Sequence, residues 1–170
     1  MIAFIDIETG GFSKERNAIC EIALLITDGN SVLHEYSAVI APYYRADGDI
    51  ASYKDDAMGI HGIPMTEIED ARHITEIFED VVRLLKHYGV HTVGGHGIKS
   101  FDLPWLNYLM MRFNGFSFMG YKEIDTLILA RNKYTGSHKL EDLCNDLGIE
   151  RGNHRALGDA RASFELYKRM

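Results

Sequence analysis

The sequence has little cysteine and little proline, and it contains no long apolar run. Cys20 and Cys144 are the only cysteines among 170 residues and lie far apart, so neither a disulfide framework nor a zinc-ligand cluster is expected. No run of about 18 apolar residues occurs, and residues 1–8 lack the basic start and cleavage site of a signal peptide. We therefore expect a protein without a membrane span that resides in a reducing compartment, the cytoplasm.

An excess of positive charge is also missing. The chain carries 18 Lys and Arg against 25 Asp and Glu, which disfavours a broadly basic protein that coats nucleic acid. The charges are uneven, however, because residues 1–98 carry 7 basic and 16 acidic side chains and residues 99–170 carry 11 and 9. A polyanion can therefore still meet a local positive surface in the second part. Candidate phosphate contacts there are Lys99, Arg112, Lys139, Arg155 and Arg161.

The order of apolar patterns predicts an α/β protein with a single domain over residues 1–170. Three β-rich runs at 2–7, 20–27 and 32–40, separated by turn signals, predict consecutive antiparallel strands. A polar stretch at 42–59 has no clear period. Thr66 and Glu69 then fit a capping box at the start of a helix that ends at Gly89. Further strands at 91–95 and 123–125, with helices at 102–111, 127–132, 140–147 and from 155 onward, predict a mixed sheet flanked by helices.

Two carboxylates end the first predicted strand on the same face. Asp6 and Glu8 are two residues apart, which places both side chains on one side of a strand. Buried there, they would repel each other and lose hydration unless a cation lay between them, and a hard divalent metal takes oxygen ligands. The alternative is that the strand end is exposed and both acids are hydrated.

Two more acids and a histidine are candidates for the same site. Asp159 lies in the first turn of the last helix beside the small residues Ala160 and Ala162. There its carboxylate either pairs with a group on a closely packed neighbour or interacts favourably with the helix dipole. His154 can point the same way as Asp159 only from the preceding loop. Asp102 precedes a helical segment, and a helix cap is its alternative role.

Together these residues resemble the DEDDh branch of the DnaQ-like 3′-to-5′ exonucleases. Residues 6–11 (Asp-Ile-Glu-Thr-Gly-Gly) resemble the first family motif, Phe101-Asp102 with Pro104 the second, and the span from His154 to Asp159 the third. Residues 60–63 and 125–127 resemble two further family segments. The order is that of the family and the match covers nearly the whole chain. One departure is Gly97, where the family commonly has Asn.

The resemblance implies a ribonuclease-H-like fold and a site with two divalent ions, Mg²⁺ or Mn²⁺. It implies that Asp6, Glu8 and Asp159 hold the metals, that Asp102 supports them directly or through water, and that His154 is the general base. The implied contacts to the 3′-terminal nucleotide are Thr9, Gly10, His61, Gly62 and Ile63. Aromatic platforms for base stacking are expected at Phe12, Phe101 or Trp105, with core packing as the default for Trp105.

The expected function is a metal-dependent exonuclease. It would release nucleoside 5′-monophosphates from the 3′ end of single-stranded DNA or RNA, in trimming, repair or proofreading. One alternative is a catalytically silent subunit that binds nucleic acid or serves as a scaffold on a polymerase. Another is a Mg²⁺-dependent endonuclease on a similar fold. A homodimer and association with a polymerase both stay open.

Overall fold

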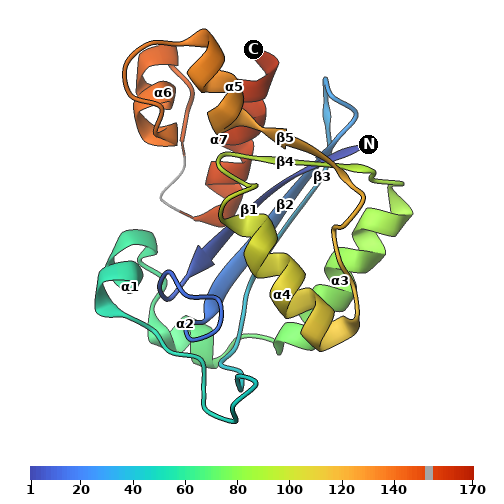
Figure 1. Ribbon diagram of the computed structural model, residues 1–170, viewed down its shortest axis with the longest axis vertical. Coiled ribbons are helices and arrows are strands. Elements are labelled where there is room, and N and C mark those ends of the chain that lie inside the picture. The colour runs from blue at the N-terminus through green and yellow to red at the C-terminus, as the bar shows by residue number, and fades with distance from the viewer. Residues whose placement is uncertain (152–154) are drawn as a thin grey trace.

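A five-stranded mixed sheet forms the centre of the computed structural model, which describes residues 1–151 and 155–170 (Figure 1). The strand order is β3-β2-β1-β4-β5. β1 pairs antiparallel with β2, and β2 antiparallel with β3, whereas β4 pairs parallel with both β1 and β5. The strands are β1 (Ile2–Thr9), β2 (Ile19–Thr27), β3 (Val32–Val39), β4 (Thr92–Gly95) and β5 (Lys122–Asp125). The predicted α/β class with three leading antiparallel strands is confirmed.

Helices cover both faces of this sheet. In Figure 1, α5, α6 and α7 lie on one side, α3 and α4 lie on the other, and α1 and α2 lie near the end of β1. No helix in the described residues is long and apolar enough to span a membrane. The helices are α1 (Asp55–His61), α2 (Met65–Glu69), α3 (Ile74–His87), α4 (Asp102–Asn114), α5 (Thr126–Lys133), α6 (Leu140–Leu147) and α7 (Ala156–Lys168).

Strand alternation in β1 divides its side chains between two cores. Ala3, Ile5 and Ile7 are buried in the cluster that includes α3 and α4. Phe4 instead packs against Phe164 of α7, with ring centroids 5.4 Å apart. Gly94 of β4 makes room for this ring, since a Cβ there would lie 2.8 Å from it. The even-numbered side chains of β1, including Asp6 and Glu8, therefore belong to the face that α7 covers.

The structure corrects one expectation about residues 42–73. Within the polar stretch, which has no clear period in the sequence, α1 begins at Asp55. The helix expected from Thr66 is two helices: α2 ends at Glu69, and α3 begins at Ile74 with the His73 side chain accepting from Thr75 N–H. Arg72, in the segment between α2 and α3, forms a β-bridge with Ile40, the residue that follows β3. This long-range pairing overrides the local capping signal.

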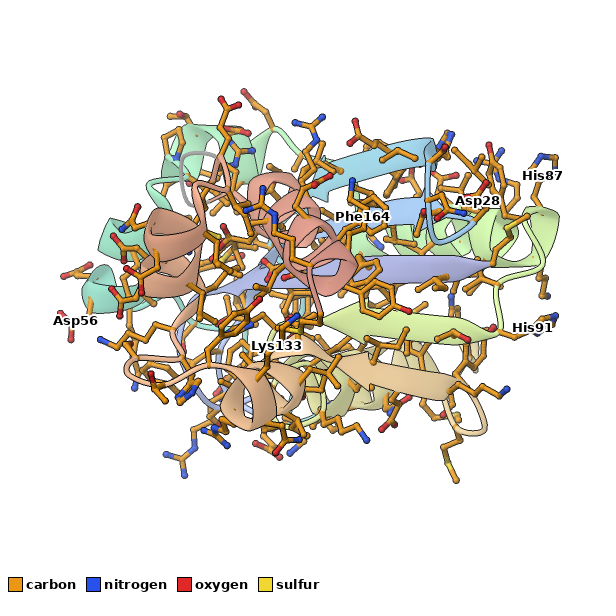
Figure 2. All side chains as sticks on the ribbon, turned by 90° about the horizontal axis from the view of Figure 1, so that it is seen from above. Asp28, Asp56, His87, His91, Lys133 and Phe164 are labelled. Carbon is orange, nitrogen blue, oxygen red and sulfur yellow. The ribbon has the colours of Figure 1, made fainter. Side chains whose placement is uncertain are left out.

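Phe164→Ala should destabilise the protein by about 3–5 kcal/mol, since it removes a fully buried ring between α7 and β1 and leaves a cavity. Figure 2 shows that Phe164 lies against the strands, away from both Asp56 of α1 and His91, which precedes β4. Urea denaturation measures the loss. Met119→Ala is the control, because Met119 is 83% exposed and should change stability by less than about 0.5 kcal/mol. Equal midpoints for both variants would contradict this packing role.

Candidate active site

Three of the predicted acidic residues meet where β1 passes the start of α7. One carboxylate oxygen from each of Asp6, Glu8 and Asp159 lies within 4.8 Å of the other two. Asp159 is in the first turn of α7. The neighbouring Ala156 and Ala160 are fully buried, and their small size lets the helix approach the strand closely. The tertiary fold thus gathers residues that are about 150 positions apart in the sequence.

Asp102 joins this acidic cluster from α4. Its side chain is buried, and Oδ1 accepts a hydrogen bond of 3.1 Å from the N–H of Ile7, the residue between Asp6 and Glu8. The alternative role as a helix cap does not apply, because Asp102 is the first residue of α4 and Phe101 occupies the cap position. Asp102 therefore ties the start of α4 to the strand that carries two of the other acids.

The acidic cluster is electrostatically unfavourable without a cation. Burial, followed by the charges of Asp102, Asp159 and Glu8, raises the pKa of Asp6 well above its usual range. Burial and the nearby Asp159 raise the pKa of Glu8 to about 8. Burial also raises the pKa of Asp102 to about 7, although the N–H donor of Ile7 opposes this. Oxygen ligands of this charge, this close together, fit a hard divalent cation.

A buried glutamate on β2 holds the start of α7 in place. Glu21 lies opposite Glu8 in the β1–β2 register and is 2% exposed. Its carboxylate accepts from Arg155 Nε at 2.9 Å, from Arg155 Nη2 at 3.0 Å and from the N–H of Ala156 at 3.1 Å. These bonds fix the first turn of α7, and with it Asp159. The sequence signal for Glu21 is a single acid within a nine-residue strand that is otherwise apolar except at its end.

The basic residues proposed as phosphate contacts are mostly engaged within the protein. Arg155 pairs with Glu21 and Glu67, Arg161 pairs with Glu35, and Lys99 pairs with Glu123. A different arginine, which sequence reasoning did not single out, reaches the acidic cluster. Arg151 donates from Nε and Nη2 to the two oxygens of Asp159, each at 2.7 Å.

A small hollow of about 150 Å³ adjoins the acidic cluster at Glu8. Its lining includes the predicted contacts Thr9, His61 and Phe101, whereas Ile63 is buried and does not line it. A larger hollow of about 830 Å³, between α3 and the end of α4, contains none of the predicted site residues. The lining residues of the small hollow are Ile7, Glu8, Thr9, Gly11, Phe12, Ala57, Ile60, His61 and Phe101.

His61 at the end of α1 offers an unused hydrogen-bond donor beside this hollow. Nδ1 accepts from the N–H of Ile63 at 3.1 Å, so the ring hydrogen of the neutral imidazole is on Nε2. Within the described part of the chain, Nε2 has no hydrogen-bond partner although it is buried. Burial lowers the pKa of His61, which favours this neutral form. Gly62 ends α1 at φ 67°, and this left-handed turn brings Ile63 back to the ring.

The backbone groups of Gly10, in the turn after β1, form hydrogen bonds within the protein. Gly10 N–H donates to Ala18 O at 2.8 Å, and Gly10 O accepts from Lys54 N–H at 2.9 Å, so these groups are already paired. The Thr9 hydroxyl donates to Gly11 O at 2.8 Å and keeps its lone pairs as acceptors. Phe12 is 85% exposed at the rim of the hollow.

Trp105 does not fit the predicted role as a stacking platform. It is 2% exposed and packs in the core, 6.0 Å from the Phe101 ring. Phe101 itself is half-buried and lines the hollow.

The loop before Asp102 is held by Asp125. The Asp125 carboxylate accepts from the N–H groups of Gly97 at 3.0 Å and Lys99 at 3.2 Å, and it caps α5. Gly97 has φ 77°, in the left-handed region. The predicted base His154 lies outside the described residues.

The fold and this acidic cluster define a nuclease of the ribonuclease-H-like class, and the comparisons with known proteins agree. The family model described as Exonuclease (RNase T) matches residues 3–167, so the chain belongs to the exonuclease family. The resemblance to DnaQ-like exonucleases found in the sequence is thereby confirmed.

Relatives by sequence include subunits of DNA polymerase III. The chain is 26% identical over 96% of its length to the epsilon subunit of Aquifex aeolicus, and spans 76% of that protein. It is 27% identical over 97% of its length to a PolC-type DNA polymerase III of Bacillus cereus, of which it spans 11%.

Relatives by structure are also exonucleases. E. coli Exonuclease I in complex with a dT13 oligonucleotide matches at a TM-score of 0.78 and 19% identity, over 98% of this chain and 40% of that one. Exonuclease X in complex with 5′-overhanging duplex DNA matches at a TM-score of 0.68 and 25% identity, over 99% and 90%.

Glu8→Gln should stabilise the metal-free protein increasingly as pH rises from 5 to 8. The unfolded chain ionises Glu8 above its ordinary pKa of 4.5, whereas the folded protein holds the proton until about 8. Wild type therefore loses folding free energy across this window, and the Gln variant does not. In EDTA, the melting temperature of the variant should exceed that of wild type by about 5 °C or more at pH 8 and by little at pH 5.

Glu79→Gln, at an exposed position of α3, is the control and should follow wild type at every pH. Parallel melting curves for Glu8→Gln and wild type would contradict the raised pKa of Glu8.

Proposed function

We propose that this protein is a metal-dependent 3′-to-5′ exonuclease that releases nucleoside 5′-monophosphates from single-stranded DNA or RNA. The observation that carries the proposal is the cluster of buried and half-buried carboxylates beside a hollow just large enough for part of one nucleotide. The hollow is lined from three directions, by the end of β1 and its turn, by α1 and by Phe101. Such a shape favours a chain end over a continuous strand.

In this proposal Asp6, Glu8 and Asp159 hold two divalent ions, Mg²⁺ or Mn²⁺, and Asp102 supports them directly or through water. Their oxygen donors and mutual repulsion fit such ions. When bound, a pair of divalent ions promotes ionisation of the attacking water and stabilises the attacking and leaving oxygens.

The remaining side chains bind the substrate end and move the proton. The Nε2–H of His61 donates to the sugar or base of the terminal nucleotide, and the exposed Phe12 ring provides a stacking surface. His154 accepts the proton of the attacking water, because the ordinary pKa of an imidazole, about 6.5, suits a base near neutral pH. This role rests on its position five residues before Asp159 in the sequence.

A silent scaffold subunit on a polymerase is the second candidate, favoured by the DNA polymerase III relatives. Against silence stands the electrostatic cost of keeping Asp6, Glu8, Asp102 and Asp159 together in a buried cluster, which a purely structural subunit does not need. Polymerase association and a homodimer are compatible with activity and are separate questions.

Asp6→Asn should lower nuclease activity by at least about a thousandfold, because it removes one carboxylate that would hold the metal. The protein should stay folded, because the Asn side chain has nearly the same shape as Asp. The assay incubates labelled single-stranded DNA and RNA, with free or blocked 3′ ends, in Mg²⁺, Mn²⁺ or EDTA. Wild type should give a ladder of mononucleotide steps that requires both metal and a free 3′ end.

Asp146→Asn, at an exposed position of α6, is the matched control and should keep wild-type activity. Absence of degradation by folded wild type with either metal would support the scaffold candidate. Cleavage of blocked substrates would indicate an endonuclease.

His154→Ala should reduce kcat by about a hundredfold and leave the Kd for Mn²⁺ within about threefold of wild type, since a general base acts on the water and not as a ligand. Single-turnover kinetics and calorimetric titration with Mn²⁺ measure the two quantities. Parallel losses of turnover and metal affinity would instead place His154 among the groups that bind the metal.

A further inference from the structure

Arg151 forms an ion pair with Asp159, one of the proposed metal ligands. Its guanidinium forms a bidentate pair with Asp159, from Nε to Oδ1 and from Nη2 to Oδ2, both at 2.7 Å. Both oxygens of this carboxylate therefore already accept a charge-assisted hydrogen bond, the strong kind. The pair is shielded from water, since the side chains of Arg151 and Asp159 are only 18% and 10% exposed.

The positive charge of Arg151 acts on the whole acidic cluster. It lowers the pKa of both Asp6 and Glu8 and so partly opposes the effect of burial. Arg151 thus supplies part of the charge compensation that a divalent ion would give.

Arg151 also has a second carboxylate within reach. Its Nη1 lies 3.8 Å from Oε2 of Glu141 in α6, whose side chain is 60% exposed. Arg151 belongs to neither α6 nor α7, so the guanidinium can leave Asp159 for the exposed Glu141 without unwinding a helix. A cation entering the cluster would repel the guanidinium in that direction.

We propose that Arg151 is a built-in counter-ion that competes with divalent cations for Asp159 and so sets the metal affinity of the site. The proposal rests on the metal site in the proposed function. In the metal-free protein Arg151 shields Asp159 from its acidic neighbours, and on metal binding it moves toward Glu141. Arg151 acts on the metal through Asp159 and is not itself a ligand. Its removal should therefore strengthen metal binding, whereas removal of a group that supports the ligands would weaken it.

The test is calorimetric titration of wild type, Arg151→Gln and Arg151→Lys with Mn²⁺ at one pH and ionic strength. Arg151→Gln should bind Mn²⁺ about tenfold more tightly, since its competitor for Asp159 is gone, and its metal-free melting temperature should fall. Arg151→Lys keeps the charge but loses the bidentate geometry, and its affinity should lie between the two. The control is Arg161→Gln. Arg161 lies on α7, the helix of Asp159, and forms a similar bidentate pair with Glu35, so this variant should leave the Kd for Mn²⁺ unchanged.

The outcomes separate this inference from the proposed function. Equal or weaker Mn²⁺ binding by Arg151→Gln, with normal binding by wild type, overturns the competition and leaves the metal site standing. No Mn²⁺ binding by wild type overturns the metal site and the competition together.

A measurement on wild type keeps the test decisive if Arg151→Gln does not fold. In protein with ¹⁵N-labelled arginine, the Nε–Hε signal that is absent from Arg151→Lys belongs to Arg151. Addition of Mg²⁺ should shift this signal and accelerate its exchange with water as the pair with Asp159 opens. A signal unchanged at saturating Mg²⁺ overturns the competition.

Discussion

Repulsion among the buried and half-buried carboxylates around β1 is the constraint that the surrounding structure must satisfy. Asp6, Glu8, Asp102 and Asp159 come from three different elements. The charges of Asp102 and Asp159 raise the pKa of both Asp6 and Glu8, and the charge of Glu8 raises that of Asp6. Carboxylates in such a setting either hold protons or require a cation. The metal-free structure provides one cation of its own, Arg151, and a divalent metal ion would provide a stronger one.

The fold holds these acids in place by contacts that lie mostly outside the acidic cluster. Phe4 and Phe164 pack α7 onto the sheet, and the pair between the buried Glu21 and Arg155 fixes the first turn of α7. Asp102 bonds to the backbone of β1, so α4 cannot move away from the strand without losing a buried hydrogen bond. Packing energy from the two cores thus offsets the cost of bringing like charges together.

Sequence reasoning succeeded where one local rule decides the outcome. Alternation in a strand placed Asp6 and Glu8 on one face, and the observed cores confirm this alternation. It failed where a distant partner decides. The Ile40–Arg72 bridge moved the start of the long helix from Thr66 to Ile74, and the pairing of Arg155 with Glu21 removed a proposed phosphate contact. For Trp105 the structure decides between core packing and stacking, because the side chain is 2% exposed and lies in the core.

The sequence by itself determined the fold class, the family and the set of candidate acids, because strand and helix periods and motif order are local properties of the chain. Only the tertiary structure decided which groups accompany those acids. Three features depend on how elements far apart in the chain pack together. These are Arg151 at Asp159, Glu21 beneath the start of α7, and the Nε2 of His61, which has no partner within residues 1–151 and 155–170. Burial and distance control charge interactions, and neither can be read from residue order, so the electrostatics of the site emerge only when the chain is folded.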